Sequence, residues 1–166
     1  MTQIANLIVN EQEYWLSDLP DYQTSSIKSM LDSGMDYEAV ASAWVNGGVA
    51  SNTAPFSASL GPRIFFEKFL DQMHDLLCTG LNYQDERAAI TAGFKPKQTG
   101  LAASISAVIA PHLGASLVFL APVVAVTLCA IGKMGLGAWC QVQTERRAST
   151  PIQTSLPPES TETDPA

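Results

Sequence analysis

A long stretch without formal charge constrains this chain more than any other feature. Between Lys97 and Glu145 the only charged side chain is Lys133, and the run ASLVFLAPVVAVTLCAI, from Ala115 to Ile131, has no ionisable group except one cysteine thiol. Apolar surface of this extent must be removed from water. Either other helices of the chain enclose the run, or it enters a membrane.

The residues around this stretch are acidic and polar. Residues 1–94 contain four basic side chains against twelve acidic ones, and the whole chain of 166 residues has a net charge of −7. We therefore divide the chain into an acidic helical domain at 1–94, a linker at 95–100 and a hydrophobic segment at 101–141. Residues 142–166 are rich in Ser, Thr, Pro and Glu, which predicts a disordered tail, because such a segment has too little apolar surface to form a core.

Residues 25–45 fit two short helices around a glycine turn. Apolar residues at i, i+3 and i+4 from Ile27 mark the first helix, Gly34 suits the left-handed residue that ends it, and Asp36 suits the N-cap of the second. A helix-turn-helix has this outline, but the second helix carries acidic residues and no basic one. DNA readers need Lys and Arg to neutralise phosphates. We expect a packing or protein-docking unit and no nucleic-acid partner.

The clearest amphipathic helix is predicted at residues 63–78, with one broad apolar stripe and a charged face. Glu67 and Asp71 lie four residues apart on that charged face, where we expect them to be solvated, and Asp75 also points away from the apolar stripe. A Ser-, Ala-, Pro- and Gly-rich segment at 49–62 predicts a loop before it. A further helix is expected at 82–92, with Asn82 as its opening residue.

The three cysteines, Cys78, Cys129 and Cys140, share no short spacing typical of a metal or redox motif. We expect reduced, mostly buried thiols. His74 and Cys78 are four residues apart on one helix face, which would suit a metal half-site or a histidine-activated thiolate. The only other histidine, His112, lies in the charge-free stretch, so a pair at the edge of the core is the better interpretation.

No motif in the chain predicts catalysis. A Gly-rich phosphate loop, a nucleophile elbow and a zinc-protease helix are all missing from the sequence. We therefore expect a non-enzymatic protein without a cofactor, a catalytic residue or a metal site.

The lengths of the apolar segments favour one membrane span. A spanning helix needs about 20 apolar residues, and Leu113 to Gly132 satisfies this condition, with a kink expected at Pro122. The preceding helix, predicted at 101–111, reaches only about 17 Å and is too short to cross alone. The alternative is a soluble hairpin in which residues 101–140 form the buried core.

Small residues along the segment suggest a contact between copies. They lie at spacings of four or eight and form the expected oligomer interface: Ala121, Ala125, Cys129 and Gly137. Lys133 and Trp139 suit the membrane interface, where lysine extends to the head groups and tryptophan is enriched.

The sequence thus predicts an all-α protein, with a small helical domain followed by a short helix, one probable transmembrane helix and a disordered tail. The leading hypothesis is a membrane-associated protein whose front domain docks or senses a protein partner. Its hydrophobic segment would insert in membrane lipid, as a homo-oligomeric, membrane-disrupting effector or as a quieter anchored adaptor. We expect the inner or plasma membrane, with the front domain in the cytoplasm. The alternative is a soluble helical protein-interaction module.

Overall fold

The fold is all-helical. The computed structural model describes residues 2–8, 11–45, 62–95 and 98–149. These residues form helices joined by turns and irregular segments, and none of them belongs to a strand, as the sequence predicts. The expected loop at 49–62, apart from its last residue, and the last part of the expected tail, 150–166, lie outside the described residues.

The described residues at the front of the chain form helices α1 (Thr2–Ala5), α2 (Gln12–Leu16), α3 (Asp21–Asp32) and α4 (Tyr37–Ala43). Helix α3 begins at Asp21, directly after Pro20 and four residues before the expected start of this segment at residue 25. Gly34 ends it with a φ of +98°, in the left-handed region that glycine tolerates. The carboxylate of Asp36 accepts a hydrogen bond from the Ala39 N–H over 2.7 Å and so caps α4. Both turn predictions are confirmed.

Helices α6 (Pro62–Leu77) and α7 (Gln84–Gly93) follow. The prediction that Asn82 opens α7 is wrong, because Tyr83 precedes the helix in a left-handed conformation with a φ of 59°. The Asn82 carbonyl instead accepts a hydrogen bond from Arg87 over 3.1 Å. The same guanidinium donates to the Leu76 carbonyl over 2.7 Å, so a single long side chain organises this turn.

The charge-free stretch folds into α8 (Leu101–Leu113), α9 (Leu117–Met134) and most of α10 (Leu136–Ser149). Gly114, with a φ of 65°, ends α8, and Ser116 caps α9 by accepting from the Phe119 N–H over 3.3 Å. Gly135 separates α9 from α10. Helix α10 includes residues 142–149, so the prediction that these residues belong to a disordered tail is wrong.

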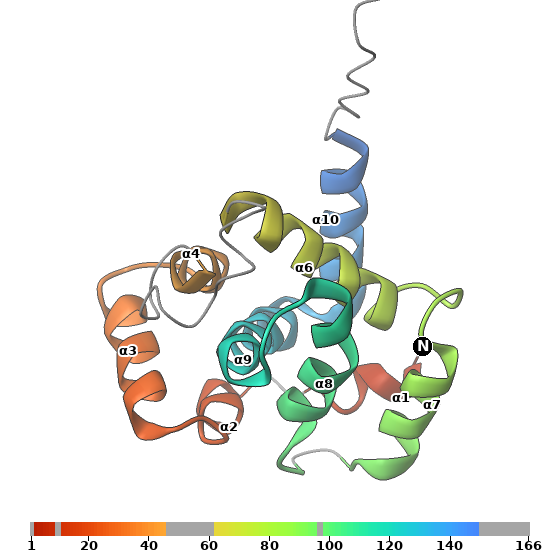
Figure 1. Cartoon of the computed structure of the whole chain (residues 1–166), viewed down its shortest axis with the longest axis horizontal. Helices are drawn as coiled ribbons and strands as arrows, with labels where there is room; N and C mark the ends of the chain where they lie inside the picture. Colours follow the sequence, from red (N-terminus) through yellow and green to blue (C-terminus); the bar gives the residue numbers. More distant parts are fainter. Residues whose placement is uncertain (1, 9–10, 46–61, 96–97, 150–166) are drawn as a thin grey trace, which may run out of the picture.

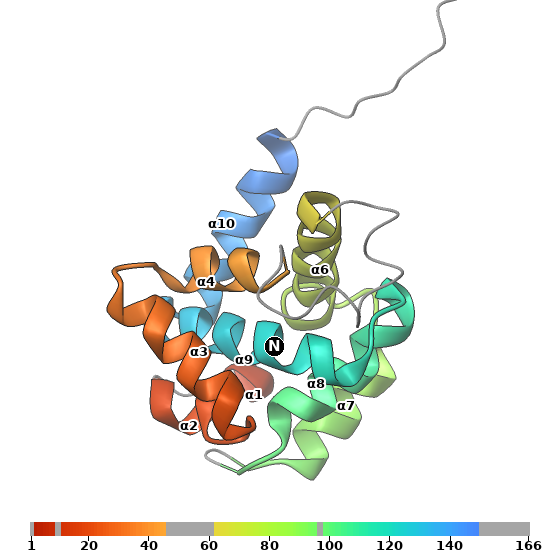
Figure 2. The ribbon, with the colours of Figure 1, turned by 60° about the vertical axis from the view of Figure 1, so that its left-hand side comes forward.

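Helix α9 occupies the centre of the bundle (Figure 1). It contacts α8, α4, α2 and α10, while α6 contacts α8 and α10 (Figure 2). Buried apolar side chains from Ile4 to Trp139 belong to one cluster. The front helices and the apolar segment consequently share a core.

Candidate functional site: the apolar hairpin and the contacts that enclose it

Helix α9 is the one helix of the described residues that is long and apolar enough to cross a membrane. Its middle is buried on every side, from Leu120 to Cys129, with the exception of the half-buried Ala121. A core helix of a soluble protein satisfies the same length and composition criteria. Together with α8 it forms an apolar hairpin, here called the α8–α9 hairpin (residues 101–134), that the other helices enclose.

The small-residue row does not lie on one free surface in this conformation. Ala125 is fully buried, and Cys129 is 3% exposed beside α2, where its thiol donates to the Gln12 carbonyl over 3.9 Å. Ala121 is half-buried, whereas Gly137 is exposed on α10. Two members of the predicted interface would become accessible only if α2 and its neighbours moved away.

The start of α9 is the least covered part of the hairpin. Leu117 and Val118 are 50% and 67% exposed, large values for apolar side chains. Pro122 has no N–H to offer the Val118 carbonyl, which instead accepts from the side-chain amide of Gln23 over 3.5 Å. The carbonyl that this proline leaves without a helical partner therefore takes part in a hydrogen bond between α3 and α9.

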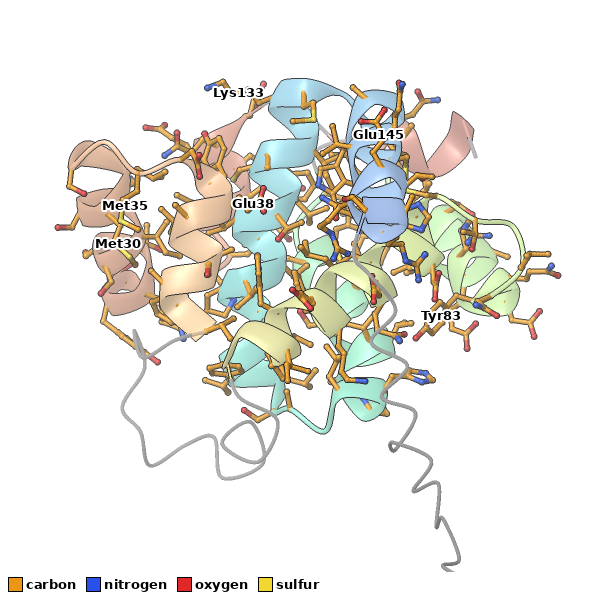
Figure 3. All side chains as sticks on the ribbon, turned by 90° about the horizontal axis from the view of Figure 1, so that it is seen from above. Met30, Met35, Glu38, Tyr83, Lys133 and Glu145 are labelled. Atoms are coloured by element: carbon orange, nitrogen blue, oxygen red, sulfur yellow. A yellow bond between two sulfur atoms is a disulfide. The ribbon has the colours of Figure 1, made fainter. Side chains whose placement is uncertain are left out.

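The other end of α9 carries Lys133, which is exposed (Figure 3). Its ammonium lies 5.9 Å from the centre of the Tyr37 ring, within the range of a cation–π contact. Trp139, the second residue expected at a membrane interface, is only 4% exposed and faces the protein interior. The structure does not bring these two side chains to a common outer surface.

A disulfide joins α6 to α10 and corrects the expectation that the thiols are reduced. The sulfur atoms of Cys78 and Cys140 are 2.03 Å apart, in residues separated by 62 positions. Only Cys129 is a free thiol among the described residues. Burial raises the pKa of that thiol to about 12, so it is protonated and unreactive at neutral pH.

Ion pairs also join α6 to α10. The Asp71 carboxylate lies 2.8 Å from Arg146 and 3.1 Å from Arg147, and Arg147 also reaches Asp75 over 3.3 Å. The expectation that Asp71 is simply solvated is therefore wrong, because its carboxylate pairs with two arginines of α10. We call this set, together with the Cys78–Cys140 bond, His74 and Thr144, the α6–α10 clasp.

His74 lies inside the clasp and is 7% exposed. Arg147 donates to its Nδ1 over 2.8 Å, so the proton of the neutral ring is on Nε2, 3.1 Å from Thr144 Oγ1. Thr144 in turn donates to the Cys140 carbonyl over 2.8 Å. Burial and, next, the Arg147 charge lower the pKa of His74, while Asp75 and Asp71 raise it and Arg146 lowers it.

This geometry argues against both the metal half-site and the histidine-activated thiolate at His74 and Cys78. A disulfide sulfur is not an activated thiolate, and both ring nitrogens of His74 already have partners in Arg147 and Thr144. Within the described ranges no group of three His, Cys, Asp or Glu side chains could hold a metal ion. The clasp is built to hold two helices together.

Little in the sequence indicates the clasp. Its partners lie more than 60 residues apart, and no local period links them. The one available signal was complementary charge, because Asp71 and Asp75 lie four residues apart on one face of α6 and α10 carries two consecutive arginines.

Comparisons of the chain with protein-family models, with curated proteins and with solved structures found no match. The function must therefore be argued from the hairpin, the clasp and the chemistry of the surrounding side chains.

Proposed function

We propose that this is a membrane-associating helical protein that folds around its α8–α9 hairpin and releases it to a bilayer when the surrounding helices separate. The observation that carries the proposal is the composition of α9. Across Leu117–Met134 its only charge is Lys133, in the last turn, where the side chain can reach lipid head groups.

The exposed start of α9 supplies the first contact. Leu117 and Val118 extend into solvent beside the α8–α9 turn, and Ile64 of α6 is 50% exposed. The rings of Phe65 and Phe119 are 5.7 Å apart, so the beginning of α6 lies next to the beginning of α9. Apolar side chains gathered at one end of a bundle are a favourable point of contact for lipid.

Release of the α8–α9 hairpin requires that the helices packed against α9 move away from it. Helices α4 and α2 pack on it through apolar side chains, whereas α10 is fastened to α6 by the clasp. Reduction of Cys78–Cys140 and protonation of His74 both weaken the clasp. We propose these two conditions as triggers.

The disulfide is relevant to the cellular compartment in which the folded protein resides. Disulfides persist in oxidising environments and are rare in the cytosol. The Cys78–Cys140 bond therefore argues for exposure of the folded bundle to an oxidising compartment, contrary to the cytoplasmic front domain that the sequence suggested. Membrane association itself is retained as our proposal.

Liposome flotation tests the proposal with a matched pair of variants. Val118→Glu places a charge at the exposed start of α9, and Leu81→Glu places one at an apolar residue that is 85% exposed between α6 and α7. We expect wild type and Leu81→Glu to float with vesicles after reduction, and Val118→Glu to remain in the soluble fraction. Equal flotation of all three proteins, or of none, would contradict the proposal.

Self-association in the bilayer is the second element of the proposal. Gly137 is exposed, and a Cβ atom added there would meet no atom of another described helix within 4 Å, so we expect Gly137→Leu to preserve the fold while blocking close approach of helices. Gly93→Leu is the control, since its surroundings are equally open. Dye leakage from liposomes should fall for Gly137→Leu alone, whereas intact liposomes at high wild-type loading would exclude a membrane-disrupting effector.

The complete burial of the middle of α9 favours a second candidate, a soluble helical interaction module. In that case α9 is only a core helix, and the acidic front helices bind a protein partner. Carbonate extraction of cell membranes separates the candidates, because a soluble module leaves with the supernatant while an inserted protein stays in the pellet.

A further inference from the structure

A cavity of about 470 Å³ lies between α4, α6, α9 and α10. Volumes of this order hold drug-sized molecules. Its walls are mostly apolar and include Phe66, Leu70, Ala130, Met134, Trp139 and Val142. Four helices line it, and the exposed residues at the start of α9, Leu117 and Val118, are not among its lining residues.

Two hydrogen-bond donors in the cavity wall have no partner within the described part of the chain. Trp139 and Gln143 are 4% and 3% exposed, and both line the cavity. The Gln143 carbonyl oxygen accepts from Arg146 Nε over 2.8 Å, which leaves its NH₂ group unpaired. Both residues border the cavity, and neither donor atom is among the fully enclosed unpaired atoms of the described residues, so a ligand oxygen in the cavity can reach and accept from them.

The charges at the rim limit the ligand further. Asp36, Glu38 and Lys133 line the cavity and are exposed, so two carboxylates face one ammonium (Figure 3 labels Glu38 and Lys133). The chain as a whole carries −7. This balance disfavours an anion. The two carboxylates available to a cation lie at the exposed rim, whereas the buried wall offers the donors of Trp139 and Gln143, which call for a neutral hydrogen-bond acceptor.

We propose that this cavity binds a neutral apolar molecule with a carbonyl oxygen, such as the ester of a medium-length acyl chain. The chain lies against Phe66, Leu70 and Val142, and the carbonyl accepts from Trp139 and Gln143. The site stands whether or not the protein associates with membranes.

Calorimetric titration of the oxidised, full-length protein tests the site with probes that differ in one group. 1-Decanoylglycerol, used below its critical micelle concentration, carries the carbonyl, and 1-O-decylglycerol is the same molecule with an ether in its place. Decanoate carries the same chain with a negative charge. We expect one saturable site for the ester, with the ether and decanoate each about fivefold weaker or worse, as the loss of a hydrogen bond predicts.

Substitutions on α10 assign the effect to the carbonyl. Gln143→Leu should weaken the ester about fivefold and leave the ether unchanged. Gln141→Leu, an exposed position two residues earlier, should change neither affinity. Ala130→Leu fills the cavity from α9 and should weaken both probes, and thermal unfolding of each variant verifies that it folds.

Three results would overturn the proposal. They are equal affinity of wild type for ester and ether, an unchanged ester affinity in Gln143→Leu, and an equal loss in Gln141→Leu. Each is independent of the flotation experiment, so failure of the ligand site and failure of membrane association are distinguishable.

Discussion

Arg147 donates a hydrogen bond to Nδ1 of His74 over 2.8 Å, and this contact fixes the histidine as a neutral ring that donates from Nε2. Protonation would place a hydrogen on Nδ1, where the guanidinium already points one, and would set two positive charges side by side. The α6–α10 clasp therefore contains a group that opposes its own protonation, with Asp71 and Asp75 only partly offsetting the effect.

The first prediction concerns pH. Burial and Arg147 lower the pKa of His74 from its ordinary 6.5, so the unfolded chain binds this proton more readily than the folded protein. The contribution of His74 to the free energy of unfolding is complete above about pH 6.5 and is lost as the pH falls below it. Urea unfolding between about pH 7.5 and 5 should show a steeper loss for wild type than for His74→Gln; parallel curves would contradict this.

The second prediction concerns the disulfide. Cys78 and Cys140 are 62 residues apart, and opening a loop of this length should lower the free energy of unfolding by about 2–4 kcal/mol. Urea unfolding with and without a reductant measures the difference. The Cys78→Ser/Cys140→Ser variant is the control, because reductant should leave its unfolding midpoint unchanged. A wild-type midpoint insensitive to reductant would exclude a stabilising bond.

The third prediction concerns the free thiol. A pKa of about 12 lowers the thiolate fraction of Cys129 at neutral pH roughly a thousandfold relative to an ordinary thiol, and the side chain is also 3% exposed. Iodoacetamide should modify no cysteine of the folded, oxidised protein and one cysteine after denaturation without reductant. Mass spectrometry counts the adducts. Rapid labelling of the folded protein would mean that α2 does not cover Cys129.

The fourth prediction concerns the cap of α4. The Asp36 carboxylate accepts from the Ala39 N–H over 2.7 Å, and its removal in Asp36→Ala should cost about 1 kcal/mol of unfolding free energy. Asp32→Ala removes an exposed carboxylate at the end of α3 and should cost much less. Ligand-free urea unfolding compares the two variants. An equal cost would show that the cap contributes little.

The local features of the fold were predictable because their causes are local. Gly34 and Asp36 act within a few residues of their own positions, and the amphipathic stripe of α6 appears in any seven consecutive residues of that helix. The bounds of α9 followed from composition alone. The predicted span, Leu113 to Gly132, starts four residues before Leu117 and ends two residues before Met134.

What could not be predicted depends on contacts distant in sequence. Arg146 and Arg147 look like part of a polar tail in the sequence, whereas in the fold both pair with Asp71 from within helix α10, which continues to Ser149. The cavity wall is equally non-local. Gln143 is an unremarkable polar residue in the sequence, and only the packing of α4, α6 and α9 around it reveals an unpaired donor.

The Cys78–Cys140 bond also has a topological consequence. It closes the chain between these residues into a ring that contains α8 and α9. A closed ring passes through a lipid sheet an even number of times, so α9 cannot cross alone while the bond is intact. The other apolar helix described within the ring, α8, has 13 residues and reaches only about 20 Å, short of the roughly 30 Å of hydrocarbon. The oxidised ring is thus confined to one side of the bilayer or to a strained pair of crossings, and a single crossing becomes geometrically permitted only once the ring is cut.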